Sequence, residues 1–500
     1  MAKVANIRMI KLGSNMRSST SSSENDNEGS TVEKNQNNSQ IANKIYNGDY
    51  KIAIYGLGHV GSAMASVWLR IGAHVIGIDK SPTVLDQARN GRTHLPEPGV
   101  NKAYREGIDS GRFSIYENLE SASRDSYMKM ICVPVLSRDG SADLSALKEV
   151  ATEVGKGLKK GDVVVINPSV PPGTTENVIS KVLEHNSSGL HVEEDFFLIY
   201  NPERIYEGRA IEDIESRYPA IIAGAGPKST LVGEELYSLI FKKGVVTMSN
   251  IRAAETEKLF EGVYRDVNIA LSNELSKLCE RLGIDYWEVR EAANSQPFCN
   301  LHKPGVGVGG ACIPVYPHFV LDTAKNLNVN CKLTEQSRLT NNSMPAHCVQ
   351  EAVKLLSNSG KKPIVDSIVT LLGLSFRGGV SDTRLSPTYD VVHELLNLNV
   401  KEIRIHDPLV FEDPGLSKYP IKVVLTKDLK KALEDTDLVF IVADHPEYVS
   451  LDLKIFGRIP VYDGRGLLRK SNPGNIRLKT IGVGSSGDYT KIETQAAPKR

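Results

Sequence analysis

Residues 50–80 have the sequence YKIAIYGLGHVGSAMASVWLRIGAHVIGIDK, whose pattern changes three times. A β-branched and apolar run leads into Gly56-x-Gly58-x-x-Gly61, and apolar residues then recur at helical spacing. A second apolar run, HVIGI, ends at Asp79. This order of strand, glycine-rich turn, helix and strand is typical of a unit that binds a dinucleotide.

Each glycine of this turn has a separate task in such a unit. Gly56 makes the tight turn, Gly58 lets the backbone approach a pyrophosphate, and Gly61 allows the helix to pack closely on the strand. A pyrophosphate binds at the helix N-terminus, where N–H groups and the helix dipole favour an anion. We therefore expect the turn, with His59 and Val60 inside it, to bind a cofactor. The alternative is an α/β turn without a ligand.

Asp79, at the end of the second strand, indicates which cofactor to expect. Its carboxylate is placed to accept hydrogen bonds from the adenosine ribose of a dinucleotide. Because the negative charge of this carboxylate would repel a 2′-phosphate, the sequence favours NAD over NADP.

Further apolar runs predict that a parallel sheet continues. MKMICVPVL (128–136) and DVVVINPSV (162–170) are typical of buried parallel strands, and each is followed by loop and helix signals. Ligands of such sheets lie beyond the carboxyl ends of the strands. Pro134, Ser169 and the loop PPGTT (171–175) are therefore expected along the cofactor cleft.

The next predicted strand runs into a charged loop. FFLIYNPERIYEG (196–208) begins with apolar residues and continues through Glu203, Arg204 and Glu207. Acids in such loops more often cap a helix or face solvent than act in catalysis. Glu203 and Glu207 become candidates because their loop is expected at the same cleft.

From about residue 251 the apolar period becomes helical. AAETEKLFEGVYRDVNIALSNELSKLCERLGIDYWEVREAAN (253–294) predicts a long helix, a break at Gly283 and a shorter helix. A helix of this kind would join two α/β halves, and we expect its exposed apolar face to form a dimer. Lys258 lies near its start. A surface lysine is the alternative, which the neighbouring Glu255 and Glu257 also fit.

The segment PGVGVGGACIPVYP (304–317) follows, and then a helical stretch from about 318 to 357. Glycines such as Gly305, Gly307 and Gly309 have no side chain to block a ligand, so the backbone can approach a bound molecule closely. The segment presents one thiol, Cys312, as a candidate nucleophile. A glycine-rich turn that carries a buried, inert cysteine is the alternative.

Composition sets limits on the class of protein. The chain has 500 residues, a length typical of about three domains. With 60 Lys+Arg and 60 Asp+Glu the net charge is zero, which gives no sign of a nucleic-acid partner. The cysteines form no CxxC pair, so we expect reduced thiols and a cytoplasmic protein. No apolar run is long enough to span a membrane, and no metal site is predicted.

The predicted fold class is α/β, with two Rossmann-like, doubly wound parallel-sheet domains joined by a long central helix region. Residues 1–48 are rich in Ser and Asn and predict a disordered tail. We expect an NAD-binding domain at 49–250 and a central helical region at 251–357. Apolar runs such as DSIVTLLGLSFRGG and IPVYDGRG predict a second α/β domain at 358–500.

Taken in order, seven motifs resemble the UDP-glucose/GDP-mannose dehydrogenase family over about residues 50–470: GLGHVG, PPGTT, NPERIYEG, AAETEKL, RDVNIALSNE, PGVGVGGACIP and GLSFRGGVSDTRLSP. RDVNIALSNE with PGVGVGGACIP is most similar to the branch that acts on UDP-N-acetylhexosamines. The resemblance implies an N-terminal NAD domain, a central dimerising region and a C-terminal nucleotide-sugar domain. It also implies oxidation of a sugar C6 alcohol to a carboxylate with two NAD, in polysaccharide biosynthesis.

The same resemblance implies roles for single residues. Cys312 is the nucleophile that forms a thiohemiacetal and then a thioester, and Lys258 is the cation beside the reacting oxygen. Glu203 is the acid/base or water-positioning carboxylate, Glu207 lies nearer the cofactor, and Ser169 touches the site. The residues implied to contact the substrate are Arg204, Gly305, Gly307, Gly309, Arg377 and Arg465.

Four positions depart from the family pattern. Tyr316 and Gly262 stand where relatives usually carry Asp and Asn, four residues after the cysteine and the lysine. Phe298 and Ala311 replace an Arg and a His that are typical of the UDP-N-acetylhexosamine branch. Loss of one donor around an oxyanion typically costs about 10²–10³ in rate. The sequence therefore leaves open a complete dehydrogenase, a silent relative that binds NAD or a nucleotide sugar, and an enzyme that stops at the aldehyde.

Overall fold

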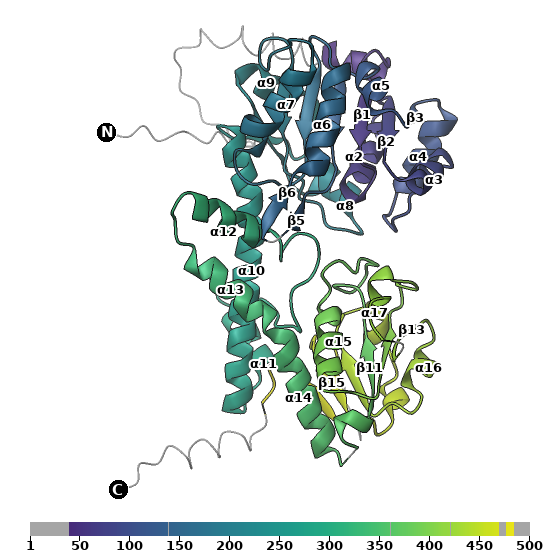
Figure 1. Ribbon diagram of the computed structural model, residues 1–500, viewed down its shortest axis with the longest axis vertical. Helices are drawn as coiled ribbons and strands as arrows, with labels where there is room; N and C mark the ends of the chain where they lie inside the picture. The colour runs from purple at the N-terminus through teal and green to yellow at the C-terminus, as the bar shows by residue number, and fades with distance from the viewer. Residues whose placement is uncertain (1–39, 139, 361, 421, 470–476, 485–500) are drawn as a thin grey trace, which may run out of the picture. The chain divides into compact units, whose positions relative to one another are not determined.

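The computed structural model describes residues 40–138, 140–360, 362–420, 422–469 and 477–484 (Figure 1). The chain divides into two compact units. The first extends to Leu136 and resumes from Asp143 to Lys258, and the second comprises Ser137–Ala142 and the chain from Leu259 onward. Each unit contains a sheet of parallel strands with helices around it, which confirms the predicted α/β fold class.

The first unit is built on an eight-stranded sheet with the order β10-β9-β8-β7-β4-β1-β2-β3. Neighbouring strands are parallel except β8 and β9. The order from β3 to β8 is the one that dinucleotide-binding folds adopt, with its switch point between β1 and β4. The strands are β1 (Ile52–Tyr55), β2 (Val75–Ile78), β3 (Phe113–Tyr116), β4 (Met128–Ile131), β7 (Val163–Ile166), β8 (Phe197–Tyr200), β9 (Ala220–Gly224) and β10 (Val245–Thr247).

Helices cover both faces of this sheet, because alternate residues of a strand point to opposite faces. In β1, Ile52 and Ile54 join one buried core with Trp68, whereas Ala53 and Tyr55 join the other. Helices α2, α4 and α9 contribute to the first core, and α6 and α7 contribute to the second. The helices of this unit are α2 (His59–Arg70), α3 (Pro82–Arg89), α4 (Val100–Asp109), α5 (Leu119–Arg124), α6 (Ser145–Gly157), α7 (Ser180–Asn186), α8 (Ala210–Glu212) and α9 (Pro227–Ser238), with π-helical turns at Thr175–Ile179 and Asp213–Arg217.

Ordered structure begins earlier than the predicted boundary at residue 48. Residues 1–39 of the expected tail lie outside the described residues, but residues 40–46 are helical. Ile45 is buried in the first core, and the Lys44 ammonium donates to the Tyr50 hydroxyl at 3.1 Å. The predicted disordered tail was too long, because a single apolar turn inside a polar stretch gives little periodic signal.

The second unit contains a six-stranded sheet with the order β13-β12-β11-β14-β15-β16. All of its strand pairs are parallel, and the order repeats that of the first unit. The strands are β11 (Ile368–Leu372), β12 (Glu402–His406), β13 (Val423–Thr426), β14 (Leu438–Ile441), β15 (Val461–Asp463) and β16 (Leu478–Thr480). Helices α15 (Pro387–Asn397), α16 (Leu429–Leu433) and α17 (Pro446–Val449) accompany it, and β5 (Leu136–Arg138) pairs with β6 (Ser141–Asp143) elsewhere.

The long helix α10 (Ile251–Leu282) has 32 residues and stops at Gly283, as the sequence predicts. Asp285 then caps α11 (Tyr286–Ala293) by accepting the N–H of Trp287. The predicted helical stretch at 318–357 is three helices: α12 (Tyr316–Asn326), α13 (Lys332–Asn342) and α14 (Met344–Asn358). Within the described parts of the chain, no helix combines the length and apolarity needed to cross a bilayer.

Candidate active site

The glycine-rich turn after β1 has the geometry of a pyrophosphate site. Gly56 adopts a φ of +95°, which favours glycine. A Cβ added to Gly61 would lie 1.7 Å from the Gly56 oxygen, so α2 can approach β1 only with glycine here. A Cβ added to Gly58 would meet no atom within 4 Å, and no side chain caps α2. His59 and Val60 open this helix, and the turn fits a dinucleotide.

Asp79 follows β2 directly and closes the same turn. Its Oδ2 accepts the N–H of Leu57 at 2.8 Å, and its Oδ1 accepts the N–H of Ser81 at 2.9 Å. Each carboxylate oxygen has a second lone pair for a ribose hydroxyl. The acid therefore positions the turn as well as offering the acceptor that the sequence predicts.

Pro134 and Ser169 lie in the loops after β4 and β7, at the carboxyl edge of the sheet where cofactor residues are expected. The loop 171–175 that follows is held by Glu255 of α10, whose carboxylate accepts the backbone N–H groups of Gly173 and Thr175. Glu255 is fully buried, so this acid does not fit the alternative of a surface position around Lys258. Burial raises the pKa of Glu255 to about 7, partly offset by these N–H groups.

The charged loop after β8 carries Glu203, Arg204 and Glu207. Burial raises the pKa of Glu203 to about 7, although the Lys258 ammonium and the N–H of Ile205, 2.8 Å from Oε2, oppose the shift. A carboxyl group with a pKa near neutrality is suited to proton transfer. The first unit thus couples Glu203 electrostatically to Lys258, as expected for a shared site.

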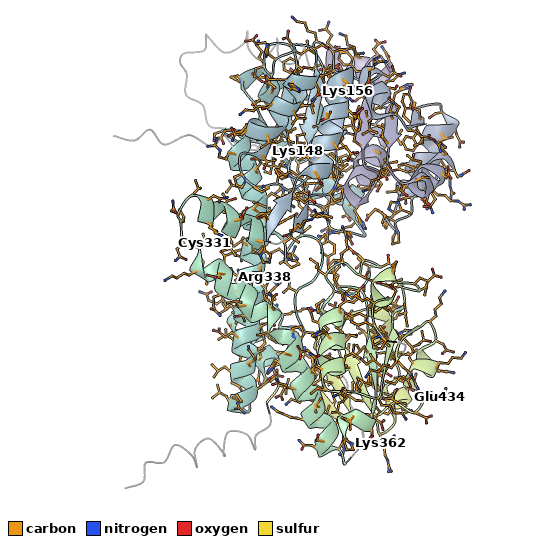
Figure 2. The ribbon with its side chains drawn as sticks, in the orientation of Figure 1. Lys148, Lys156, Cys331, Arg338, Lys362 and Glu434 are labelled. Atoms are coloured by element: carbon orange, nitrogen blue, oxygen red, sulfur yellow. The ribbon has the colours of Figure 1, made fainter. Side chains whose placement is uncertain are left out.

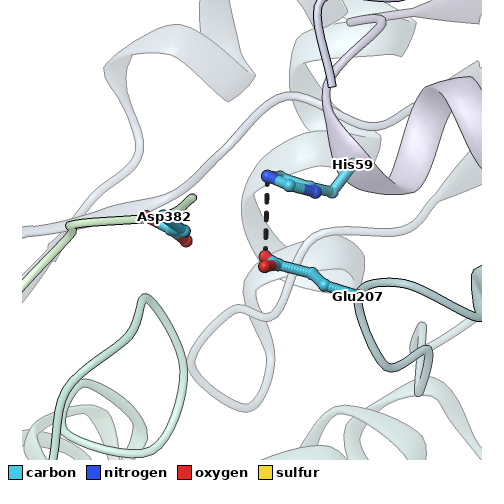
Figure 3. Close-up of side chains that lie close together, drawn as sticks. All are labelled: His59, Glu207 and Asp382. Carbon is cyan, nitrogen blue, oxygen red and sulfur yellow. Dashed lines mark ion pairs between the residues drawn. The ribbon is translucent and has the colours of Figure 1, made fainter. Parts of the chain in front are cut away.

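The other two charges of this loop have partners within the first unit. The guanidinium of Arg204 donates to the Pro219 oxygen at 2.7 Å and lies 3.9 Å from Glu257. Glu207 Oε1 lies 3.5 Å from His59 Nε2, and Figure 3 shows this pair (dashed line). The pair joins the acidic loop to the first turn of α2.

Two further acids, which the sequence analysis missed, fix the backbone of the same loop. The carboxylate of Glu97 accepts the N–H groups of Gly208 and Ala210, both at 2.8 Å. The fully buried Asp213 accepts the N–H of Tyr206 at 2.8 Å. Glu97 lies far from Glu203 in the sequence, and Asp213 lies outside the motif NPERIYEG. A signal existed for Glu97, which stands between two prolines in LPEPG (95–99).

The glycine segment of the second unit lies against a charged pair. A Cβ added to Gly305 would lie 2.8 Å from Arg465 Nη1, so the absent side chain makes room for the guanidinium. Arg465 donates to Asp444 Oδ1 at 3.1 Å. Burial alone would raise the pKa of Asp444, but Arg465 and the N–H of Gly378 outweigh burial and the pKa falls to about 2.

Gly309 and Gly310 pack against the loop after β11. A Cβ added to Gly309 would lie 2.5 Å from the Leu385 oxygen, and the N–H of Gly310 donates to the Arg384 oxygen at 2.9 Å. A Cβ on Gly307 would lie 3.1 Å from Pro387. The glycines thus permit close packing within the second unit, in addition to the access that the sequence predicts.

Cys312 lies between this anchored segment and α12. All six cysteines are free thiols within the described residues, and Cys312 is the exposed one. The alternative of a buried cysteine was therefore wrong, and the role of Cys312 as a nucleophile stays a prediction. The carbonyl of Cys312 accepts the N–H groups of Val315 and Tyr316, both at 3.0 Å.

Arg377 lies in the loop after β11, half-buried, and its guanidinium lies over the Phe376 ring. The N–H of Gly379 lies 3.3 Å from Nδ1 of the fully buried His445, and Nε2 of the same ring lies 3.1 Å from Asp407 Oδ2. Asp407 follows β12 as Asp79 follows β2, and it accepts the N–H of Leu374 at 2.7 Å. The second unit therefore repeats the acid-closed turn of the first.

A row of buried polar residues on α10 supports the glycine segment. Asp266, Asn273 and Glu280 recur every seven residues and are all buried. Asp266 pairs with Arg338 of α13, which is labelled in Figure 2. Asn273 accepts the N–H of Gly305 at 2.9 Å. The heptad spacing of these polar residues among the apolar positions of α10 was a signal for the contacts that the sequence analysis did not use.

Comparison with known proteins agrees with this geometry. Three domains of one family match in order: its NAD binding domain at residues 50–241, its central domain at 252–343 and its UDP binding domain at 370–470. The chain belongs to the UDP-glucose/GDP-mannose dehydrogenase family. It is accordingly an NAD-dependent oxidoreductase, which confirms the predicted family and cofactor.

Similar relatives cover almost the whole chain. A UDP-N-acetyl-D-mannosamine dehydrogenase of Pyrococcus horikoshii is 33% identical over 441 residues, or 87% of this chain and 99% of the relative. An NDP-N-acetyl-D-galactosaminuronic acid dehydrogenase of Ralstonia solanacearum is 30% identical over 83% of this chain and 96% of the relative. The solved structure of a UDP-D-ManNAc dehydrogenase from Pyrococcus horikoshii superposes with a TM-score of 0.79 at 32% identity, covering 87% of this chain and all of the other.

Proposed function

We propose that the protein oxidises the C6 alcohol of a UDP-N-acetylhexosamine to the uronate in two NAD-dependent steps, through a covalent intermediate on Cys312. The balanced reaction consumes one alcohol, one water and two NAD⁺, and gives one carboxylate, two NADH and three protons. The observation that carries the proposal is the exposed thiol of Cys312, held just before α12 in a chain that also contains the NAD site.

Each protein group has a defined task in this reaction. Bound NAD accepts a hydride in each oxidation. Glu203, with its pKa near 7, takes the proton of the alcohol and later the proton of the attacking water. The Cys312 thiolate adds to the aldehyde carbon and forms a thiohemiacetal, whose oxidation gives a thioester that water hydrolyses. The Lys258 ammonium stabilises the negative oxygen that develops in each addition.

The remaining site residues have binding roles in the proposal. The turn with Gly56, Gly58, His59, Val60 and Gly61 and the acid Asp79 hold NAD, together with Pro134, Ser169 and Glu207. Arg204, Arg377 and Arg465 bind the nucleotide sugar, with backbone N–H groups of Gly305, Gly307 and Gly309. The names of the relatives support an N-acetylhexosamine, and we propose that the uronate is used in polysaccharide biosynthesis.

The alternative is a silent relative that binds NAD or a nucleotide sugar without oxidising it. Tyr316 and Gly262 favour this alternative, because they lack the carboxylate and the side-chain amide that relatives usually carry at these two positions. An enzyme that stops at the aldehyde is intermediate between the two. The three possibilities predict about two, one or no NADH per sugar.

The experiment measures NADH at 340 nm with a panel of UDP- and GDP-sugars and identifies the product by mass spectrometry. Wild type is expected to give two NADH per sugar and a uronate. Cys312→Ala should abolish the second oxidation, while Cys331→Ala, at a half-buried cysteine, should leave turnover unchanged. No turnover on any sugar, with NAD still bound, would reject the proposal in favour of the silent relative.

We also propose that the chain forms a homodimer through α10 and works in the cytoplasm. Four large apolar side chains of α10 are exposed in the single chain: Phe260, Tyr264, Leu271 and Leu278. Burying such a stripe is favourable. Light scattering should give the mass of a dimer for wild type and of a monomer for Leu271→Glu/Leu278→Glu. A monomeric wild type would contradict the dimer.

The cytoplasmic location is supported by the six cysteines, all of which are free thiols.

A further inference from the structure

Tyr316 packs directly on Gly262, the glycine of α10. A Cβ built on Gly262 would lie 2.4 Å from Cδ2 of Tyr316, 3.1 Å from its Cβ and 3.2 Å from its Cγ. Carbon atoms in favourable contact are about 3.5–4.0 Å apart. Because these atoms include the base of the tyrosine side chain, the ring cannot move aside without moving the start of α12. A side chain at 262 and the ring at 316 therefore exclude each other.

The same tyrosine is connected to Cys312 by a short, hydrogen-bonded turn. The N–H groups of Tyr316 and Val315 both donate to the Cys312 carbonyl at 3.0 Å. Tyr316 and Val315 are each 7% exposed, whereas Cys312 is exposed. One hydrogen-bonded turn therefore connects the buried ring on α10 to the exposed thiol four residues earlier.

A second anchor lies on the other side of the thiol. The N–H of Gly310 donates to the Arg384 oxygen at 2.9 Å, and a Cβ on Gly310 would lie 3.0 Å from the Phe376 ring. Gly310 thus joins the segment to the loop after β11, and Tyr316 joins it to α10. Cys312 lies two residues from one anchor and four from the other.

We propose that Tyr316 is a positioning residue whose ring, seated on Gly262, fixes the Cys312 thiol relative to α10. The inference rests on the proposed function, in which Cys312 is the nucleophile. A small residue at 316 leaves a gap over Gly262, and any side chain at 262 displaces the ring. Either change releases the thiol, whereas Tyr316→Phe keeps the ring contact with Gly262.

The packing is tested by thermal unfolding of Gly262→Ala, Tyr316→Ala and the double variant. Alanine is intrinsically better than glycine inside a helix. Gly262→Ala should therefore lower Tm when Tyr316 is present and raise it when residue 316 is alanine, a reversal of sign. Gly233→Ala of α9, where the new Cβ meets flexible isoleucine ends, should shift Tm equally in both backgrounds. An equal shift for Gly262→Ala would overturn the proposal.

The positioning role is tested by the rate at which iodoacetamide alkylates Cys312, followed by mass spectrometry across pH. Tyr316→Ala and Gly262→Ala should change this rate about tenfold and lower kcat by about 10², with a smaller effect on KM, because a displacement near 1 Å can cost that much. Tyr316→Phe and Gly233→Ala should match wild type. Tyr316→Leu, which lacks the ring, replaces Tyr316→Ala if the latter does not fold.

The results separate this inference from the proposed function. A changed alkylation rate with a reversed Tm shift supports the role of Tyr316 even when no sugar is oxidised. A wild type that oxidises its substrate, with Tyr316→Ala equal to it in kcat and in alkylation, overturns the positioning role and leaves the proposed function standing.

Discussion

The buried carboxylate of Glu255 accepts the backbone N–H of Thr175 at 2.8 Å, and it also accepts that of Gly173. The loop 171–175 is thereby fixed to the first turns of α10, three residues before Lys258. Glu255→Ala leaves two buried N–H groups without this acceptor, at about 1–3 kcal/mol each. Urea denaturation should show a corresponding loss in the free energy of unfolding.

Two variants control this prediction. Glu255→Gln retains one acceptor oxygen, so its loss should be smaller than that of Glu255→Ala. Glu149→Ala removes an exposed acid of α6 and should change the free energy of unfolding by no more than about 0.5 kcal/mol. Equal effects of Glu255→Ala and Glu149→Ala would contradict the structural role.

The pH dependence of turnover should report Glu203. Its pKa is raised to about 7, so the carboxylate form that accepts protons appears as pH rises through about 7. The value of kcat/KM should climb over this range and then level. Glu203→Gln should remove the rise and lower kcat by about 10²–10⁴, the usual contribution of a general base.

The free energy of unfolding should also depend on the protonation of Glu203, and it should fall over the pH range in which kcat/KM rises. Because the pKa is about 7 in the folded protein and 4.5 as the reference value, the folded state holds a proton that the unfolded chain releases. This contribution to stability is complete below pH 4.5 and is lost as pH rises through about 7. Glu203→Gln should reduce the dependence of the free energy of unfolding on pH in this range. Glu255 contributes a similar dependence, which Glu255→Gln should remove. A slope unchanged in both variants would refute the assignment.

Glu97 should matter for the acidic loop although it touches none of its acids. Glu97→Gln offers one acceptor oxygen for two N–H donors, so the backbone of Gly208 or Ala210 loses a hydrogen bond. Hydrogen exchange at these two amides should accelerate about tenfold or more, since a lost bond of about 1.5 kcal/mol has that effect. Hydrogen exchange in β11 of the second unit is the internal control. Unchanged exchange at Gly208 and Ala210 would show that Glu97 does not hold the backbone of this loop.

Asp407 should stabilise the second unit except in strong acid. Burial would raise its pKa, but His445 and several backbone N–H groups lower it to about 2. The stabilisation is therefore present above the reference value of 3.8 and lost as pH falls through about 2. Asp407→Asn should cost about 3 kcal/mol at pH 7 and progressively less toward pH 2. Asp452→Asn, at an exposed helix cap that Asn also satisfies, should cost little.

The sequence predicted most of the first unit because its signals are local. The strand, the glycine turn and the helix that begins at His59 follow one another within 20 residues, and Gly283 ends α10 where expected. Periodicity and turn chemistry record such neighbours directly. The same logic found the second sheet from its apolar runs alone, without a glycine fingerprint.

The supports of the site were harder to predict because they join distant residues. Glu97 reaches Gly208 across 111 positions, and Glu255 reaches Gly173 across 82. No local pattern encodes which backbone groups a buried acid will meet after folding. The contact between Gly262 and Tyr316 was visible in the sequence only as two unusual residues, and the structure explains them together.

A Cβ added at Gly61 would lie 1.7 Å from the Gly56 oxygen, and a variant with this clash would be useful in a genetic experiment. One extra methyl group at this position forces α2 away from β1, whereas the sequence of the second unit is unchanged. We expect Gly61→Ala to impair NAD binding at this turn, so the variant would distinguish phenotypes that need oxidation from phenotypes that need only the protein's presence. A knockout cannot make that distinction.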